Sequence, residues 1–465
     1  MTRRPRAAPI PASPTPERGP AENSLPDRIR TDLRRHDLEH VQERVLQWSL
    51  SEQVDLMERL PPRDRAVVFR LLPRSAAFQA FVRLDASLQS ELLTALRTDE
   101  VQGLVAELDP DDRVRLLDEL PAPVVRALLS ELSPQDQDTT GVVMGYPAGS
   151  VGRRMSPEFV ALGLDTTVAD ALAAVRERID DAETVYALPV VDQDQRVAGV
   201  VGLRRLLATD GDVPVAEIAR EAVTVGAQTP AEEAARRCAK EKLLALPVLD
   251  GTGRVVGILT FDDALDILEE AETEDVARSA GAEPLRRPYL ATPVPSVFRA
   301  RVVWLLVLAV GASLTVRVLE VFESTLEQMV VLSVFVPLLI GTGGNTGNQA
   351  ATTVTRALAL GDVRVRDVGR VALREVRIGA LLGSTLGAVG FAGVGVIYGW
   401  DVGAVIGLTL LAVCVLAATV GGVMPMAARA LKVDPAVFSN PFITTFVDAS
   451  GLVVYFLIAR AVLGL

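Results

Sequence analysis

Residues 337–359 read PLLIGTGGNTGNQAATTVTRALA, so an apolar run passes directly into glycines, amides and hydroxyls. Four polar residues recur there at three- and four-residue spacing, which places them on one face of a helix: Asn345, Asn348, Gln349 and Thr352. Polar side chains are unfavourable against lipid, so this face should look into a helix bundle or a water-filled path. The interspersed glycines, Gly344 among them, permit close backbone approach or local unwinding that frees carbonyl oxygens.

The composition indicates a multi-domain membrane protein. Hydrophobic residues make up 49% of the 465 positions and charged residues 23%, which suits a charged soluble part joined to a membrane part near residue 295. A net charge of −12 disfavours nucleic acid as a partner and suits cations. Two cysteines provide no disulfide framework, so the soluble part is expected to be cytosolic. The sequence contains only two histidines, His36 and His40, which lie together near its start. A zinc site or histidine-based catalysis is therefore disfavoured, and we expect no enzyme.

The soluble part begins with a helical array. Residues 1–28 are rich in proline and arginine and are expected to be a disordered tail. Over 29–150, leucine recurs every twelve residues, and proline follows several of these leucines: Leu60, Leu72, Leu84, Leu96, Leu108, Leu120 and Leu132. This spacing predicts a stack of short helices that pack on one another like a solenoid, with an ordinary helical bundle as the alternative.

Residues 151–262 contain an α/β repeat. ALPVVDQDQRVAGVVGL at 187–203 aligns with ALPVLDGTGRVVGILTF at 245–261, and helices are predicted before them at 168–179 and 231–241. The pattern resembles a tandem pair of CBS domains, which implies a regulatory module that often binds adenine nucleotides. The family's nucleotide motif matches Gly257, Thr260 and Asp263, whereas the first repeat has Gly202 and Arg205 at the last two positions. At most one ATP site is therefore expected, and Asp263 could instead bind a cation.

An acidic linker helix is predicted within 263–295. Eight acids fall between residues 262 and 275, and like charges at helical spacing repel one another. A solvated linker is the simplest interpretation, but a divalent cation with oxygen ligands would offset the repulsion.

Five membrane spans are predicted within 296–465, at about 300–322, 329–355, 374–398, 403–428 and 441–464. Arginines gather before the first span and between the second and third, so the N-terminal half should lie in the cytosol. The third span carries glycines at four-residue spacing, which predicts a close helix–helix contact.

The fifth span carries an intramembrane acid. SNPFITTFVDASG at 439–451 starts a helix, and Asp448 follows about two turns in, ~10 Å from the cytosolic end and near the depth of Asn345. Such a carboxylate is a functional candidate, because its alternative partner Arg317 lies near the opposite end of the first span. An acid beside amides and hydroxyls suits a cation path, in which a hydrated Mg²⁺ is held through its waters.

Taken together, these parts resemble the MgtE family of magnesium transporters and channels over about residues 40–465. The most specific stretches are 337–359 and VDPAVFSNPFITTFVDASG at 433–451. The resemblance implies a multi-pass protein of the cell membrane, a homodimer with a Mg²⁺ pore on its two-fold axis. It assigns the pore carboxylate to Asp448 and the cytosolic side of the path to Asn440, with Asn345, Gly344 and Thr352 beside them.

The resemblance also implies regulation by cytosolic Mg²⁺. Residues 264–283 resemble the family's plug helix, and Mg²⁺ ions would bridge the cytosolic domains, the plug and the membrane domain to close the pore. The matching acids are Asp263, Asp266, Glu274, Asp275, Glu375, Asp434, Asp109, Asp111 and Asp112. Ala271 stands where another plug acid is expected. The alternative function is a secondary transporter that exchanges a divalent cation for Na⁺ or H⁺.

Overall fold

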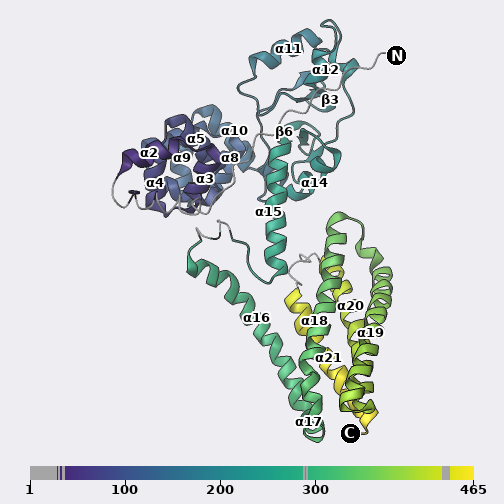
Figure 1. The fold of residues 1–465 in the computed structure, drawn as a ribbon. Coiled ribbons are helices and arrows are strands. Elements are labelled where there is room, and N and C mark those ends of the chain that lie inside the picture. The colour runs from purple at the N-terminus through teal and green to yellow at the C-terminus, as the bar shows by residue number, and fades with distance from the viewer. Residues whose placement is uncertain (1–28, 30–31, 34–36, 286–288, 290–291, 432–439) are drawn as a thin grey trace, which may run out of the picture. The chain divides into compact units, whose positions relative to one another are not determined.

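The computed structural model describes residues 29, 32–33, 37–285, 289, 292–431 and 440–465 (Figure 1). Two compact units divide the chain: residues 1–263 with 286–291, and residues 264–285 with 292–465. The expected disordered tail, residues 1–28, and the regulatory candidate Asp434 lie outside the described residues.

The predicted stack of short helices is confirmed. The regularly spaced leucines stand at the helix C-termini. Leu60, Leu72 and Leu84 are C-cap residues with an extended backbone, which ends each helix, and their side chains are buried in the core. The next helix then starts at a proline or a capping residue, as at Ser49 and Asp85, whose side chains accept from backbone N–H groups. The helices are α2 Leu38–Leu46, α3 Leu50–Arg59, α4 Pro62–Leu71, α5 Arg74–Arg83, α6 Ala86–Ala95, α7 Thr98–Glu107, α8 Pro110–Asp118, α9 Ala122–Glu131 and α10 Pro134–Met144.

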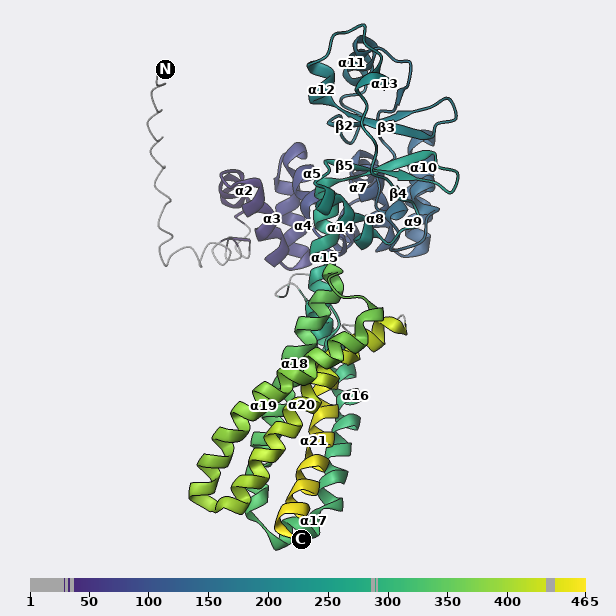
Figure 2. The same cartoon turned by 90° about the vertical axis from the view of Figure 1, so that its right-hand side faces the viewer.

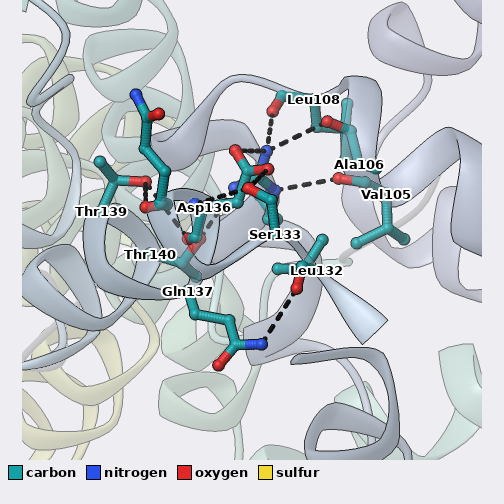
Figure 3. A network of polar contacts seen from close by, with 11 residues as sticks. Val105, Ala106, Leu108, Leu132, Ser133, Asp136, Gln137, Thr139 and Thr140 are labelled. Carbon is teal, nitrogen blue, oxygen red and sulfur yellow. Dashed lines mark hydrogen bonds and ion pairs between the residues drawn. The ribbon is translucent and has the colours of Figure 1, made fainter. Parts of the chain in front are cut away.

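Buried arginines join successive helices of this array. Arg113, in α8, is 2% exposed and donates from Nε to the Val105 carbonyl at 2.9 Å and from Nη2 to the Leu108 carbonyl at 2.6 Å. Its Nη1 donates to Thr140 Oγ1 of α10 at 2.9 Å (Figure 3). Arg65 occupies the same place in α4 and binds the carbonyls at the end of α3 in the same way. These side chains satisfy carbonyls that a helix end leaves unpaired.

The predicted CBS pair is also confirmed, as two similar halves. Each half is a three-stranded sheet in which a short first strand pairs in parallel with the middle strand, and the middle strand pairs antiparallel with the third. The backbones of Arg196 and Arg254, its equivalent in the second half, pair in an isolated antiparallel β-bridge. The elements are η2 Val151–Arg153, β1 Leu162–Gly163, α11 Val168–Glu177, β2 Ala187–Val191, β3 Val197–Gly202, α12 Leu203–Leu207, α13 Val215–Ile218, β4 Val225–Gly226, α14 Ala231–Glu241, β5 Ala245–Leu249 and β6 Val255–Thr260.

The acidic linker is helix α15, Phe261–Ser279, which begins directly after β6. Its chain crosses the boundary between the two units at Asp263. The helix ends before Gly281, whose φ of +69° reverses the backbone in a conformation that favours glycine.

The second unit contains the long apolar helices (Figure 2). They are α16 Val294–Val321, α17 Glu323–Gln328, α18 Val331–Leu360, η4 Val365–Asp367, α19 Val368–Tyr398, α20 Trp400–Ala430 and α21 Asn440–Leu463. Among the described residues, four segments are long and apolar enough to span a membrane: 294–321, 365–398, 400–430 and 440–463. The second of the five expected spans falls on α18, which does not meet that criterion because its C-terminal half carries the polar stretch.

The glycine face predicted in the third span packs on α20. A Cβ atom on Gly383 would lie 2.7 Å from Cα of Leu411, so the two backbones touch at this position. At the far end of the unit, Arg460 of α21 donates from Nε to Thr325 Oγ1 at 3.0 Å. Its guanidinium lies 4.9 Å from the centre of the Phe322 ring. These contacts hold the α16–α17 corner against α21.

Candidate functional site

The candidate ion path lies between α18 and α21. Asn440, Thr444 and Asp448 recur at four-residue spacing on α21, so they share one face. That face meets α18 at Gly344, where an added Cβ would lie 3.0 Å from Thr444 Cγ2 and 3.9 Å from Asp448 Oδ1. Thr444 Oγ1 donates to the Asn440 carbonyl at 2.7 Å and lies 3.3 Å from Asn348 Oδ1. The absence of a side chain at Gly344 therefore lets α18 reach the acid.

Asp448 is the polar group of this path that the rest of the unit leaves unsatisfied. Its Oδ1 atom is buried and has no hydrogen-bond partner among the described residues. A buried carboxylate oxygen without a donor is unfavourable, and a cation or a cation-bound water would satisfy it.

The polar residues of α18 fall on two adjacent faces rather than one. Asn348 turns towards α21 with Gly344, four residues earlier. Asn345, Gln349 and Thr352 are exposed on the surface of this single chain. The reason is helical phase: residues 344 and 348 share one face, and residues 345, 349 and 352 share the next.

Glu375, a predicted regulatory ligand, is buried in α19. It packs against α20 at Gly422, where an added Cβ would lie 2.6 Å from Glu375 Cγ. The α15 candidates Asp266 and Asp275 are exposed, and Glu274 forms an ion pair with Arg278 one helical turn later.

A second site lies in the first unit, and we call it the acidic cluster: Asp109, Asp111, Asp112, Glu158, Glu183 and Asp263. Asp109 stands at the N-cap of α8 but makes no capping hydrogen bond, and the next two acids follow in the first turn. Two loops of the first CBS half bring the glutamates together, because the Glu183 N–H donates to the Glu158 carbonyl at 2.8 Å. Asp263 stands in the first turn of α15. The cluster thus joins the helical array to the CBS pair.

The electrostatics of the acidic cluster are unfavourable without a counterion. Burial raises the pKa of Asp111 well above its usual value, and the charges of Asp263 and Glu183 raise it further. Burial, together with the charges of Asp109 and Asp263, raises the pKa of Glu183 to about 7. Burial also raises the pKa of Asp263 to about 6, against the hydrogen bond from Thr260, which lowers it. It is therefore unfavourable for all of these carboxyl groups to be ionised together at neutral pH.

The acidic cluster fits a hydrated divalent cation better than a bare one. No three acids, histidines or cysteines in the described part of the chain stand ready to hold a metal ion directly. Asp111 Oδ1 is nevertheless buried and finds no hydrogen-bond partner among the residues that the structure describes, and Asp111 itself is only 9% exposed. Mg²⁺ keeps several of its waters, which could bridge carboxylates that stand too far apart for direct coordination.

Thr260 and Asp263, the nucleotide candidates, contact each other directly. Thr260 is 3% exposed, and its Oγ1 donates to Asp263 Oδ2 at 2.5 Å. One oxygen of Asp263 is therefore held by Thr260 at the end of β6, and the same side chain raises the pKa of Asp111 and Glu183 in the acidic cluster.

Sequence reasoning missed Glu158 and Glu183. Both lie in loops of the first CBS half, without a motif or a spacing that relates them to Asp111. Only the parallel bridge between Phe159 and Thr184 sets them side by side.

Comparison with known proteins identifies the family. The MgtE family model, a divalent cation transporter, matches residues 336–458, the MgtE intracellular N domain matches 48–149, and CBS domains match 148–210 and 215–270. The magnesium transporter MgtE of Thermus thermophilus is 36% identical over 450 residues, which cover 95% of this chain and 99% of that protein. The chain belongs to the MgtE family. Membership in this transporter family confirms that the chain is not an enzyme.

Further relatives span much of the MgtE chain. The magnesium transporter MgtE of Bacillus subtilis is 28% identical over 423 residues, covering 87% of this chain and 93% of that protein. A crystal structure of the cytosolic domain of the Mg²⁺ channel MgtE in complex with ATP is 32% identical and covers 52% of this chain and 100% of its own, with a TM-score of 0.48. The family and the four apolar helices make this chain a membrane protein.

Proposed function

We propose that this chain carries Mg²⁺ across the cell membrane along the contact of α18 and α21, with its N-terminal domains in the cytosol. The observation that carries the proposal is Asp448: a carboxylate oxygen buried in an apolar unit, facing Gly344, with no hydrogen-bond donor in the part of the chain that the structure describes. A hydrated Mg²⁺ supplies the positive charge and the water donors that this oxygen lacks. Asn440 and Thr444 continue the same face towards the start of α21.

A second copy of the chain completes the path in this proposal. Asn345, Gln349 and Thr352 are exposed on one chain, and polar side chains are unfavourable against lipid. In a homodimer with its two-fold axis beside α18, these side chains line the path opposite their equivalents, and the two Asp448 carboxylates face one ion.

The acidic cluster regulates transport in this proposal. When cytosolic Mg²⁺ is plentiful, it neutralises Asp111, Glu183 and their neighbours and holds the helical array against the CBS pair. When Mg²⁺ is scarce, repulsion separates them and the path opens by a population shift. Asp266, Glu274 and Asp275 of α15, with Glu375 and Asp434, provide further Mg²⁺ contacts in this scheme. Neutralising Glu274 and Asp275 together should raise the Mg²⁺ concentration that halves the flux, and an unchanged concentration would remove α15 from the sensor.

ATP is a second regulatory ligand in this proposal, at one site of the CBS pair. Thr260 at the end of β6 and Asp263 in the first turn of α15 match the nucleotide motif, whereas the first half has Gly202 and Arg205. Because Asp263 also belongs to the acidic cluster, nucleotide and Mg²⁺ would influence each other's affinity.

The test is Mg²⁺ flux into liposomes containing the full-length protein, with internal Mg²⁺ and ATP varied independently. Asp448→Asn should reduce flux at least about tenfold while the protein keeps its unfolding temperature. Asp401→Asn, at the exposed start of α20, is the matched control and should transport normally. Wild-type flux from Asp448→Asn would overturn the path. Flux that requires a Na⁺ or H⁺ gradient, rather than voltage alone, would favour the exchanger.

A further inference from the structure

The end of helix α15 is attached to the start of the membrane helices inside the second unit. Gly281 lies against α21, because a Cβ there would be 3.1 Å from Pro441 Cγ. Two residues later, the Glu283 N–H donates to the Ala300 carbonyl of α16 at 3.1 Å. Trp304 Nε1, one turn further along α16, donates to Glu283 Oε1 at 3.1 Å. The segment after α15 therefore bridges α16 and α21.

Trp304 extends this attachment to the helix of the ion path. Its ring meets Phe442 of α21 edge to face, with ring centres 6.1 Å apart and planes at 78°. Phe442 lies two residues after Asn440, on the side of α21 that faces α16, while Thr444, one turn after Asn440, contacts Asn348 of α18. A displacement of Phe442 therefore moves the candidate path as well.

The two ends of the α16–α21 contact differ in how firmly they are held. At the far end, Phe322 is 7% exposed, stacks on Phe456 with ring centres 4.9 Å apart, and borders Thr325, which is 1% exposed. At the α15 end, Glu283 is exposed and Trp304 is only half-buried. Among the described residues, the side chains that hold the α15 end are at least partly exposed, so water can satisfy Glu283 and Trp304 and this end can separate at low cost while the far end stays packed.

We propose that Gly281, Glu283 and Trp304 form a latch that positions the first turn of α21, and with it Asn440, according to where α15 ends. Trp304 is a positioning residue that acts through Phe442. This inference rests on the proposed function, because it gives α15 a mechanical route to the ion path in addition to its own acids. Towards the lower end of their usual strengths, which suits partly exposed groups, the hydrogen bond alone biases an opening equilibrium by about threefold, and the hydrogen bond and the aromatic pair together by about tenfold.

The transport arm compares matched variants of the full-length protein in liposomes. Glu283→Ala and Trp304→Leu should raise the cytosolic Mg²⁺ concentration that halves the flux by about threefold to tenfold, with flux at low Mg²⁺ within about twofold of wild type. Glu283→Gln keeps an acceptor for Trp304 and should behave as wild type. Trp400→Leu removes an exposed tryptophan that contacts Phe391 away from the latch and should change neither quantity.

The second arm does not depend on transport. The chain has three tryptophans, so a Trp48→Phe, Trp400→Phe background reports on Trp304 alone. Its emission should shift to longer wavelength when Mg²⁺ is removed, and Glu283→Ala should show the shifted emission at every Mg²⁺ concentration.

The outcomes separate the latch from the proposed function. A wild-type protein that carries no Mg²⁺ refutes the proposed function, whatever Trp304 reports. Normal Mg²⁺ inhibition of Glu283→Ala, together with a Trp304 emission that ignores both Mg²⁺ and the substitution, refutes the latch alone. A variant whose flux falls at all Mg²⁺ concentrations without a change in the half-inhibiting concentration also refutes the latch. Such a variant has lost folded protein, and the protein that remains is still inhibited by Mg²⁺ as in the wild type.

Discussion

Replacing Glu183 by glutamine should strengthen the contact between helix α8 and the CBS pair when no Mg²⁺ is present. Burial and neighbouring acids raise the pKa of Glu183 from 4.5 to about 7. Ionising this carboxyl in the closed arrangement is therefore harder than in the open one by about 3 kcal/mol. Glutamine keeps the shape of the side chain and removes that charge, so Glu183→Gln should raise the opening free energy at about pH 7.5 by up to about 3 kcal/mol.

The pH dependence has a definite sign. In this structure burial, followed by the charges of neighbouring acids, raises the pKa of Glu183 to about 7. We expect an opened contact to expose the carboxyl and return its pKa towards 4.5, so the closed state binds the proton more tightly. Opening of the wild-type contact should therefore become harder as the pH falls through 7, by about 2 kcal/mol between about pH 7.5 and 5.5. The gain from Glu183→Gln should shrink by the same amount over that range. Saturating Mg²⁺ at the higher pH should protect the wild type more than the variant.

Hydrogen exchange of the α8 amides in the full-length protein, followed by mass spectrometry, measures this opening directly. Protection is compared after correction for the pH dependence of intrinsic exchange. Glu177→Gln removes an exposed acid of the same CBS half and serves as the control. Equal protection of the α8 amides in the wild type and in Glu183→Gln, measured without Mg²⁺ at both pH values, would refute the idea that repulsion within the acidic cluster opens the contact between α8 and the CBS pair.

Two further predictions concern stability. Arg113→Met should lower the free energy of unfolding of the helical array in urea by about 3 kcal/mol, because it leaves carbonyls at the end of α7 without a hydrogen bond. The control Arg126→Met, on an exposed position of α9, should have little effect. Equal urea midpoints for the two variants would show that water satisfies those carbonyls. Gly383→Val should destabilise the detergent-solubilised protein by about 2 kcal/mol and lower its unfolding temperature, because the new side chain meets the α20 backbone. Gly393→Val has open space around its Cβ and should be tolerated. Similar unfolding temperatures for the two variants would contradict the close contact of α19 with α20 at Gly383.

The sequence predicts the fold of this chain well because its signals are local. The twelve-residue spacing of leucines such as Leu60 and Leu72 places helix ends, and the extended backbone at these positions follows from the prolines behind them. The CBS repeat is visible as two aligned strand pairs, and helix α14 runs from Ala231 to Glu241 as predicted. Gly383 and its neighbours at four-residue spacing likewise indicate a helix–helix seam without naming the partner helix.

The candidate sites are less predictable because they join distant segments. Asp111 is one acid among many in the array, and nothing local distinguishes it from Asp85, which simply caps its helix. Its neighbours Glu158 and Glu183 reach it through the tertiary fold alone. In the membrane unit, the spacing of polar residues predicts that α18 has a polar side. The packing of α21 at Gly344 is needed to show which side chain faces the acid: Asn348 turns towards α21, and Asn345 lies on the adjacent, exposed face.

Helix α16 has a consequence for how the protein is made. None of its residues is buried, and its main packing partner is α21. During synthesis α16 leaves the ribosome before α18, α19, α20 and α21, so it must reside in the bilayer without its partner until α21 has followed. The middle of the helix, residues 302–316, carries no charged side chain, so lipid can solvate it on every side during that period. Premature termination before α21 would therefore leave an inserted but unassembled first span, a natural target for membrane quality control.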